Sequence, residues 1–308
     1  MTPHHSSLIF ILLISLASAF AQDSQISPTL FSLFEAERAF AKRCGEVGIR
    51  ASFTEFFADD GIAFRPHPEK YKAAVKDRPT PPNQLAFELL WEPIFGEVSA
   101  AGDMGYDTGP SIFTDKTAEK PTPSYGFFFS VWKKQADGTW KVALDLGTDT
   151  KAPYTGSREL QTVRPVSREI VPVKFDTVTA RARAFLIAAD RALGEVARAD
   201  GVAKAFSRYL LEESRLHRNG MQPILGKSAI CAFLSQKTLK QFCKPIFADL
   251  SRSRDLGYTY GSYELKENDA QNSTVEKGYY VRVWKQDKHA DWKLVLDVTS
   301  PLPPEEKK

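Results

Sequence analysis

The segment GFFFSVWKKQADGTWKVALD, residues 126–145, decides the fold class of this 308-residue chain. It consists of two stretches rich in aromatic and β-branched residues, which flank the turn sequence Gln135-Ala136-Asp137-Gly138. Such stretches are typical of β-strands, and an Asp-Gly pair between two of them is typical of a hairpin turn. Both predicted strands carry apolar residues on both faces, so we expect a sheet that is covered on both sides.

The same segment returns later in the chain as GYYVRVWKQDKHADWKLVLD, residues 278–297, at an offset of 152 (278 − 126). The sequence DMGY at 103–106 returns as DLGY at 255–258 with the same offset. Nearer the N-terminus the offset is 153, as it is between Arg65 and Arg218. Because chance does not hold one offset over so many residues, we interpret the chain as a tandem duplication of a domain of about 120 residues.

Each copy is predicted to begin with helices, which gives an α+β fold. Ser27-Pro28 is a helix-start signal, followed by Leu30, Phe31, Phe34 and Phe40 on one predicted face. A second helix is expected to carry Phe53, Phe56 and Phe57 and to end at Asp59-Asp60. The counterpart of the first helix in the second copy is expected to begin near Val178 and to present Phe185, Ala189, Leu193 and Val196.

Changes in composition predict the boundaries of the chain's parts. A stretch with Pro, Gly and scattered charges but no apolar period is typical of a linker. We expect a signal peptide at 1–21, a first domain at 26–150, a linker at 151–175, a second domain at 176–300 and a flexible tail at 301–308.

The N-terminus is typical of an exported protein. The run LIFILLISLASAF, residues 8–20, contains no charge, and the small-x-small sequence Ala19-Phe20-Ala21 precedes a polar stretch. This order predicts a secretory signal peptide that is cut after Ala21, leaving a periplasmic or secreted chain without a membrane span. An uncleaved N-terminal anchor is the alternative, because no Lys or Arg precedes the apolar run.

Charge and composition exclude several kinds of partner. A net charge of +3, from 41 Lys and Arg against 38 Asp and Glu, is too small to favour nucleic acid. The spacing of Cys44, Cys231 and Cys243 fits no zinc pattern, and with five His residues we expect neither a metal site nor a cofactor. We interpret the cysteines as small buried apolar residues, with a Cys231–Cys243 disulfide as the alternative.

Within each copy the motifs follow the pattern W-x-P, G-D-hydrophobic-G-Y-x-x-G, G-Y-Y-x-x-V-W-K and W-K-hydrophobic-hydrophobic-x-D. In the first copy these motifs lie at 91–93, 102–109, 125–133 and 140–145. The sequence resembles the nuclear transport factor 2-like superfamily, which includes SnoaL-like and ketosteroid-isomerase-like proteins, and in particular its exported bacterial members of unknown function. The second copy departs from the pattern, with Cys243 in place of Trp91, Arg254 in place of Gly102, and no Asp-Gly turn.

This resemblance implies the architecture of each copy. The expected fold is two tandem cone-shaped domains, each with N-terminal helices packed on a strongly curved antiparallel sheet and a pocket between them. In this superfamily the convex sheet face commonly packs against a second subunit. A covalent tandem can make that contact internally, so we expect an intramolecular pseudo-dimer and a monomeric mature protein.

The superfamily contains both enzymes and binding proteins, so the fold does not decide the function. An isomerase of this type needs a carboxylate base with two oxyanion donors, and a dehydratase needs a His–Asp pair. Neither set maps onto this chain, and whether it is an enzyme stays open. The favoured hypothesis is a non-catalytic binding or accessory module for a small hydrophobic or weakly acidic molecule. The alternatives are an isomerase- or dehydratase-like enzyme doing proton transfer on a hydrophobic ligand in the first cone, and a purely structural pseudo-dimer.

Four polar positions occur in both copies and are the candidates for a site. They pair as Arg65 with Arg218, Asp103 with Asp255, Tyr106 with Tyr258, and Asp145 with Asp297. We interpret the aspartates as structural partners of the backbone or of arginine. Because only the first copy keeps the family-like residues, we expect any ligand site within 26–150, formed by Tyr106, Arg65 and Trp91.

Overall fold

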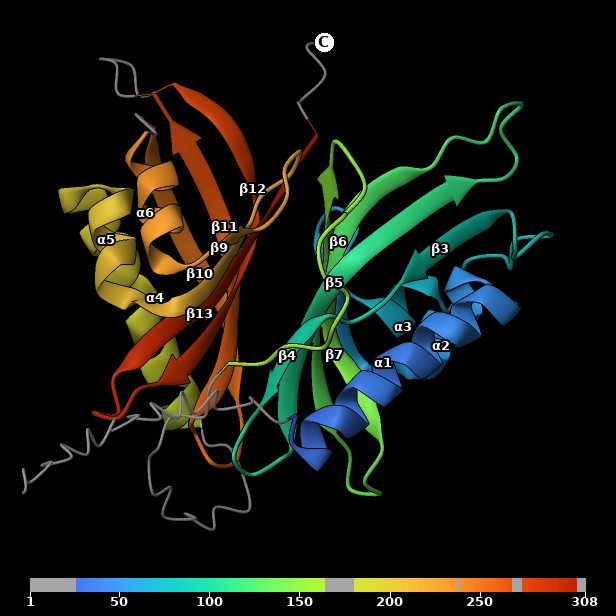
Figure 1. Cartoon of the computed structure of the whole chain (residues 1–308), viewed down its shortest axis with the longest axis horizontal. Coiled ribbons are helices and arrows are strands. Elements are labelled where there is room, and N and C mark those ends of the chain that lie inside the picture. Colours follow the sequence, from blue (N-terminus) through green and yellow to red (C-terminus); the bar gives the residue numbers. More distant parts are fainter. Residues whose placement is uncertain (1–25, 164–179, 237–238, 268–272, 304–308) are drawn as a thin grey trace, which may run out of the picture.

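The computed structural model describes residues 26–163, 180–236, 239–267 and 273–303. They form two domains of one design, each with helices packed on a curved sheet (Figure 1). The predicted α+β class is confirmed. The predicted signal peptide, residues 1–21, lies outside the described residues, as do 164–175 of the predicted linker and 304–308 of the tail.

The first domain places its helices before most of its strands. Its elements are α1 (Pro28–Val47), α2 (Ile49–Phe56), β1 (Phe57–Phe64), β2 (Pro68–Lys70), α3 (Tyr71–Val75), β3 (Phe87–Trp91), β4 (Phe95–Val98), β5 (Met104–Asp115), β6 (Ser124–Lys134) and β7 (Trp140–Thr150). The strands form one sheet in the order β2-β1-β7-β6-β5-β3, and β4 also pairs with β5.

The second domain repeats this plan. Its elements are α4 (Ala180–Asp200), α5 (Val202–Tyr209), β8 (Leu210–His217), β9 (Ile224–Leu225), α6 (Lys227–Ser235), β10 (Lys240–Leu250), β11 (Leu256–Lys266), β12 (Thr274–Gln286) and β13 (Trp292–Pro301). The sheet order is β10-β11-β12-β13-β8-β9. Long antiparallel neighbours dominate both sheets, but β1 pairs with β7 and β8 with β13 in parallel, so each sheet is mixed rather than purely antiparallel.

The second helix of the first domain, α2, is shorter than predicted. It ends at Phe56, because Phe57 adopts an extended backbone and pairs with Val142 of β7. Asp59 and Asp60 are therefore exposed residues of β1 rather than the end of a helix. The strand begins directly at the helix terminus, with no intervening loop that composition alone would reveal.

Helix α1 begins as predicted, with the Ser27 hydroxyl accepting a hydrogen bond from the amide of Leu30 at 3.2 Å. Its buried face differs from the predicted one, since Phe31 is 49% exposed. The buried residues are Leu30, Leu33, Phe34, Glu37, Phe40 and Cys44. The helix lies close to the sheet at Gly105, where an added Cβ would be 2.4 Å from a methyl group of Leu33.

In α4 the buried face is also displaced from the predicted one. Phe185 is 59% exposed, and Ala182, Leu186, Asp190, Leu193 and Ala197 face the sheet. Each long helix thus carries one acidic residue, Glu37 or Asp190, in the middle of its apolar stripe. Neither side chain is accessible to solvent.

The predicted hairpin between β6 and β7 is present, with Gly138 at a φ of 86° in its turn. The second domain keeps the same left-handed backbone at the equivalent position, where Ala290 has a φ of 65°. Loss of the Asp-Gly pair has therefore not changed the turn, although an alanine at positive φ costs free energy that a glycine does not.

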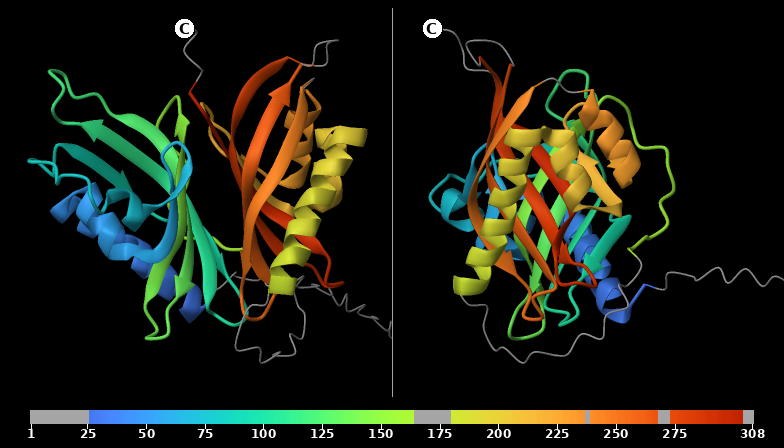
Figure 2. Two further views of the ribbon diagram at one scale, coloured as in Figure 1. Left: turned by 180° about the vertical axis from the view of Figure 1, so that it is seen from behind. Right: turned by 90° about the vertical axis from the view of Figure 1, so that its left-hand side faces the viewer.

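The two sheets pack face to face, with the helices on the two outer sides (Figures 1 and 2). One cluster of buried apolar residues includes both sheets. From the first domain it takes Tyr106, Phe129 and Leu144 among others, and from the second Tyr258, Val283 and Leu296. Val163, in the segment predicted as linker, also packs in this cluster, and Gln161 forms a backbone bridge to Phe95.

Polar contacts across the sheets are nearly symmetric. Lys133 donates to Asp249 at 2.5 Å, and at the equivalent positions Lys285 donates to Glu97. Asp103 accepts from the backbone amide of Arg252 at 3.0 Å, while Asp255 accepts from that of Ala100 at 2.9 Å. Asp103 and Asp255, two of the candidate site positions, therefore join the domains.

The three cysteines are free, and Cys231 and Cys243 do not form the alternative disulfide. Cys44 is buried, while the other two are partly buried. Among the described helices, none combines the length and apolar character that a membrane crossing requires.

Candidate functional site

A row of polar residues crosses the middle of the first sheet, on the face that the helices cover. Asp107 of β5 lies opposite Ser130 of β6, and Ser130 lies opposite Asp145 of β7. Residues paired directly across neighbouring strands share one face of the sheet, so the three side chains form a continuous strip. The hydroxyl of Ser130 donates to Asp145 at 3.1 Å.

Glu37 of α1 lies over this strip and joins it to two tryptophans. Its carboxylate accepts a hydrogen bond from the indole Nε1 of Trp91 at 2.5 Å and another from that of Trp132 at 2.7 Å. Asp107 lies nearby, fully buried, with its carboxyl group close to that of Glu37. The helix therefore brings a second buried carboxyl group against the one that the sheet already carries.

Burial and mutual repulsion make these acids hard to ionise. Burial raises the pKa of Glu37 to about 7, although the hydrogen bond from Trp91 lowers it. Burial raises the pKa of Asp107 well above its usual range, and the neighbouring Glu37 raises it further. Two close carboxyl groups away from water cannot both ionise, so Glu37 and Asp107 hold at least one proton at neutral pH.

Asp145 differs from these two acids because it lines an open cavity. Burial raises its pKa to about 6, while the charge of Arg65 and the hydrogen bond from Ser130 lower it. An acid with this pKa is mostly ionised at pH 7 yet accepts a proton readily. Asp145 is therefore the acid of the first domain that is both titratable near neutral pH and within reach of a ligand.

The cavity has a volume of about 240 Å³ and lies between α2 and the sheet, where strands β1, β3, β5, β6 and β7 contribute to its wall. Its walls are largely apolar and aromatic, and its polar groups are Arg65, Ser111 and Asp145. The guanidinium carbon of Arg65 lies 5.1 Å from the ring centroids of both Phe53 and Tyr71. Arg65 is thus held by aromatic faces, and within the described part of the chain no carboxylate forms an ion pair with it.

The second domain has the same strip with different charges. Thr259, Arg282 and Asp297 replace Asp107, Ser130 and Asp145 across strands β11, β12 and β13. Asp190 replaces Glu37 above them. The buried Arg282 forms ion pairs with Asp190 and, at 2.8 Å, with Asp297.

Charge is consequently balanced in the second domain. Arg218 also pairs with Asp297 at 2.7 Å, so two buried carboxylates face two guanidinium groups. Burial alone would raise the pKa of Asp297, but Arg218 and Arg282 bring it below the usual value. In this domain Asp297 stays ionised and paired, which is the structural role that the sequence interpretation gave to both aspartates.

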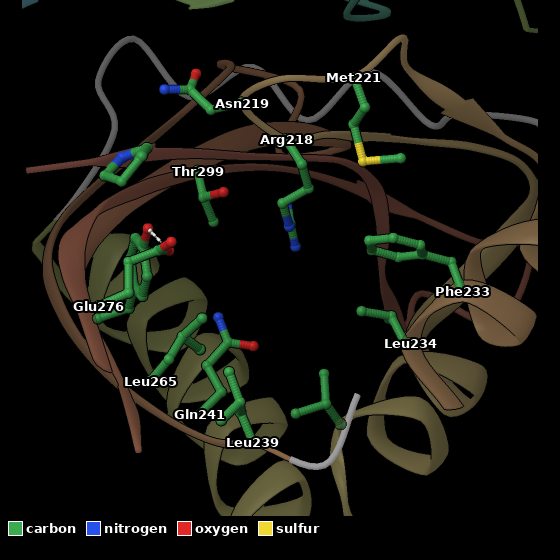
Figure 3. A pocket seen from close by; sticks show the side chains of 13 residues that line it. Arg218, Asn219, Met221, Phe233, Leu234, Leu239, Gln241, Leu265, Glu276 and Thr299 are labelled. Atoms are coloured by element: carbon green, nitrogen blue, oxygen red, sulfur yellow. Dashed lines mark hydrogen bonds between the residues drawn. The ribbon is translucent and has the colours of Figure 1, made fainter. Parts of the chain in front are cut away.

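A cavity of about 260 Å³ is present in the second domain as well. Figure 3 shows Arg218 and Gln241 pointing into it from opposite sides, with Phe233, Leu234 and Leu265 around them. The polar residue Glu276 on its wall accepts a hydrogen bond from Tyr263 at 2.6 Å. The two domains therefore differ in the charge of their polar strips rather than in whether a cavity is present.

The structure brings together two of the three predicted site residues. Arg65 and Trp91 both line the first cavity. Tyr106 lies on the opposite face of the sheet, 1% exposed in the core between the two domains, where its hydroxyl donates to Glu97 at 3.3 Å. Strand alternation causes this separation, because the helix packs on Gly105 and the next residue must point away from it.

The sequence interpretation did not identify Glu37, Asp107 or Ser130 as site residues. A signal for Glu37 was present, since it interrupts the apolar stripe of α1 and precedes Arg38 just as Asp190 precedes Arg191. The described residues contain no group of three or more His, Cys, Asp or Glu side chains arranged to hold a metal ion.

No protein-family model and no curated protein matches the sequence. Solved structures do match parts of the chain. A nuclear transport factor 2-like protein with a cystatin-like fold from Novosphingobium aromaticivorans is 15% identical, over 39% of this chain and 82% of its own, with a TM-score of 0.34. A ketosteroid isomerase-like protein from Erwinia carotovora atroseptica is 16% identical, over 41% and 99%, with a TM-score of 0.33.

The similarity is to nuclear transport factor 2-like proteins. This is the group that the sequence motifs resemble, and each match covers about the length of one domain. A further example, from Cytophaga hutchinsonii, is 13% identical over 41% of this chain and 100% of its own, with a TM-score of 0.33. Identities and scores this low carry no information about substrate or activity.

Proposed function

We propose that this protein binds a small, largely apolar molecule in the cavity of its first domain. The observation that carries the proposal is the pairing of an apolar aromatic cavity with one polar end, formed by Asp145 and Arg65. Binding sites for small molecules combine mostly apolar walls with a few convergent polar groups in this way. The volume of about 240 Å³ is below that of drug-sized sites, so the ligand is a small one.

The charges at the polar end suggest what the ligand presents there. Asp145 accepts a hydrogen bond when ionised, and Arg65 donates one at any relevant pH. A weakly acidic hydroxyl group, such as that of a phenol, satisfies both side chains by donating to the carboxylate and accepting from the guanidinium. The apolar remainder of the molecule then lies against Trp91 and Phe128.

The test uses 4-nitrophenol, a small phenol whose absorbance distinguishes the neutral form from the phenolate. Titration into the purified protein should give a saturable spectral change. Arg65→Ala removes the donor to the hydroxyl oxygen, and Asp145→Asn removes the negative charge of the acceptor, so each should weaken binding at least tenfold. Tyr106→Phe is the matched control, since Tyr106 lies on the other face of the sheet.

Binding that is unchanged in both cavity variants would contradict this proposal. A loss in Arg218→Ala instead would assign the ligand to the cavity of the second domain, where Arg218 is the equivalent residue. The thermal unfolding of each variant, measured without ligand, separates a lost contact from a damaged fold.

One observation favours proton transfer as a second candidate function. The pKa of Asp145, raised to about 6 by burial, suits a general base that works near neutral pH. The equivalent Asp297 is held ionised by two arginines and does not suit this role. In this reaction Asp145 takes a proton from a carbon or oxygen of the ligand, and Arg65 stabilises the negative charge that develops.

Exchange of ligand protons for deuterium tests this second function without knowledge of the product. A ketone with acidic α-protons, such as cyclohexanone, is incubated with the protein in deuterated water and followed by NMR. Catalysed exchange should rise with pH about a midpoint near 6 and disappear in Asp145→Asn. Exchange at the rate of buffer alone would leave ligand binding as the function of the cavity.

We also propose that the protein acts after export. The support is the order of charge-free run, small-x-small sequence and polar stretch at residues 8–25. A periplasmic or secreted binding protein would meet its ligand outside the cytoplasm.

A further inference from the structure

A third hollow lies between the domains and belongs to neither cone. It has a volume of about 510 Å³. The first domain contributes Phe127 and the segment that follows β7, including Tyr154, and the second contributes Arg215 of β8 together with Pro223 and Leu225. We call it the interdomain groove.

Arg215 is the single charged residue among those that line the groove. Its guanidinium carbon lies 3.5 Å from the ring centroid of Phe95. One nitrogen donates a long hydrogen bond, 3.4 Å, to the side-chain oxygen of Gln161, and Nε is buried without a partner. Among the residues that the structure describes, no carboxylate forms an ion pair with it.

An arginine whose role is purely structural is seldom left with so few hydrogen-bond partners. A guanidinium group has five N–H donors, and one that is largely withdrawn from water normally faces a carboxylate. Burial lowers the pKa of Arg215 to about 10, so the group remains charged at neutral pH despite that cost. The stacking on Phe95 uses one face of the guanidinium, so its in-plane donors stay available, apart from the one that is bonded to Gln161.

The pseudo-symmetry of the molecule shows that the fold does not require this arginine. Its equivalent in the first domain, at the offset of 153, is Ile62. On that side of the interface Phe64 packs against Tyr260, at 5.8 Å between centroids, and against Tyr279, at 6.0 Å. One side of the interface is therefore closed by aromatic packing, while the other holds a charged group beside a hollow.

We propose that the interdomain groove binds a small organic carboxylate. The carboxylate pairs with the in-plane donors of Arg215, and an apolar body lies along Phe127, Tyr154 and Leu225. A planar guanidinium matches the geometry of a carboxylate, and the groove supplies apolar walls without an opposing acid. A groove with a single charged side chain fits a monoanion better than a phosphate, which draws on several charged donors.

Benzoate is the probe for this site, and the intact protein is titrated with it by calorimetry. Arg215→Met should weaken benzoate binding at least tenfold. Benzamide, which has the same shape without the charge, should bind the unaltered protein at least tenfold more weakly than benzoate. Arg65→Ala is the matched control for an arginine in the first cavity, and it should leave the benzoate affinity within a factor of two.

A second variant guards against an effect of Arg215→Met on folding. Leu225 is 52% exposed, so Leu225→Asp should leave the fold intact while placing a negative charge at the mouth of the groove. It too should weaken benzoate binding at least tenfold. Saturating benzoate should raise the unfolding temperature of the unaltered protein and not that of either variant.

The outcomes separate this site from the one in the first domain. Benzoate affinity that survives both Arg215→Met and Leu225→Asp would overturn the proposal and leave Arg215 as a clamp on Phe95. Affinity lost in Arg65→Ala but kept in Arg215→Met would overturn it equally, because the anion would then occupy the first cavity. Neither result depends on whether 4-nitrophenol binds beside Asp145.

Discussion

Ser130 and Arg282 occupy the same position in the two sheets, and they give the neighbouring aspartate different partners. Ser130 gives Asp145 a single hydrogen bond at 3.1 Å. Arg282 gives Asp297 an ion pair at 2.8 Å and also pairs with Asp190 on the helix above. The same fold thus keeps its central acids uncompensated in one domain and neutralised in the other.

Asp145→Asn should change stability in a way that depends on pH. The pKa of Asp145 in the folded protein, about 6, lies above its usual value of 3.8, so the folded state favours the protonated form. Its contribution to stability is fully present below pH 4 and is lost as the pH rises through 6. Asparagine resembles the protonated acid, so the variant should match the original protein at pH 4 and be more stable at pH 8, by up to about 3 kcal/mol.

Thermal unfolding at a series of pH values measures this difference. The useful quantity is the difference in stability between Asp145→Asn and the original protein, since other groups titrate in the same pH range. His217, whose pKa is lowered to about 3 by burial, adds stability as the pH rises and partly hides the effect of Asp145 in the original protein alone. A constant difference between pH 4 and pH 8 would contradict the assignment.

Arg282→Met should destabilise the second domain strongly. The side chain of Arg282 is inaccessible to solvent, and its removal leaves the buried carboxylates of Asp190 and Asp297 without their shared partner. Leaving a buried charge unpaired costs about 3–5 kcal/mol. Chemical denaturation measures the loss, and adding Asp190→Asn to the variant should restore part of it, because one uncompensated charge is removed.

The two lysine bridges between the domains should differ in importance. Lys285 and Glu97 are both about nine-tenths buried, and Glu97 has no other cation partner among the described residues. Lys285→Met should therefore cost about 3–5 kcal/mol. Lys133→Met is the control, and it should cost clearly less, because its side chain is 34% exposed and Asp249 keeps Arg183 at 3.0 Å. Equal losses of unfolding free energy in denaturant titrations would show that Arg183 does not compensate Asp249 for the loss of Lys133.

The protein should be a monomer, and its separate domains should not be. The sheet face of each domain carries large apolar residues, such as Phe129 and Val283, that the other domain covers. An exposed face of this kind favours association. Size-exclusion chromatography with light scattering should give the molar mass of one chain for the intact protein. Residues 26–163 expressed alone should dimerise or aggregate. A stable, soluble, monomeric single domain would contradict this prediction.

Export predicts a specific N-terminus. Cleavage after Ala21 leaves Gln22 as the first residue, so mass spectrometry of the protein recovered outside the cytoplasm should find residues 1–21 missing. Recovery of the intact chain in the membrane fraction would favour the uncleaved anchor instead.

The repeat made most of the architecture predictable from sequence, because Trp132 and Trp284 keep their spacing to many neighbours within each copy. The parallel pairing of β1 with β7 had no local signal, since strand direction depends on contacts between residues about 80 positions apart. Tyr106 was misplaced for a related reason. Alternation separates it from Gly105, but only the contact between Gly105 and Leu33 tells which of the two faces the helix covers.

Of the three acids on this face of the first sheet, the sequence makes Asp145 a candidate but not Glu37 or Asp107. Glu37 comes from a helix, and Asp107 and Asp145 from strands that are not neighbours. Their shared environment exists only after the helix packs on the sheet, and so do the pKa values that make them unusual. A single sequence shows the residue types but not the burial that gives them their chemistry.

The near-symmetric contact between the two sheets has a consequence for how such a protein evolves. In a dimer of identical chains, every substitution appears twice, and a change that suits one subunit burdens the other. Here the partners are joined in one chain, so a gene can place serine at position 130 and arginine at position 282. The first domain can then carry buried acids that lower its stability, while the second domain, whose buried charges are paired, can offset that loss.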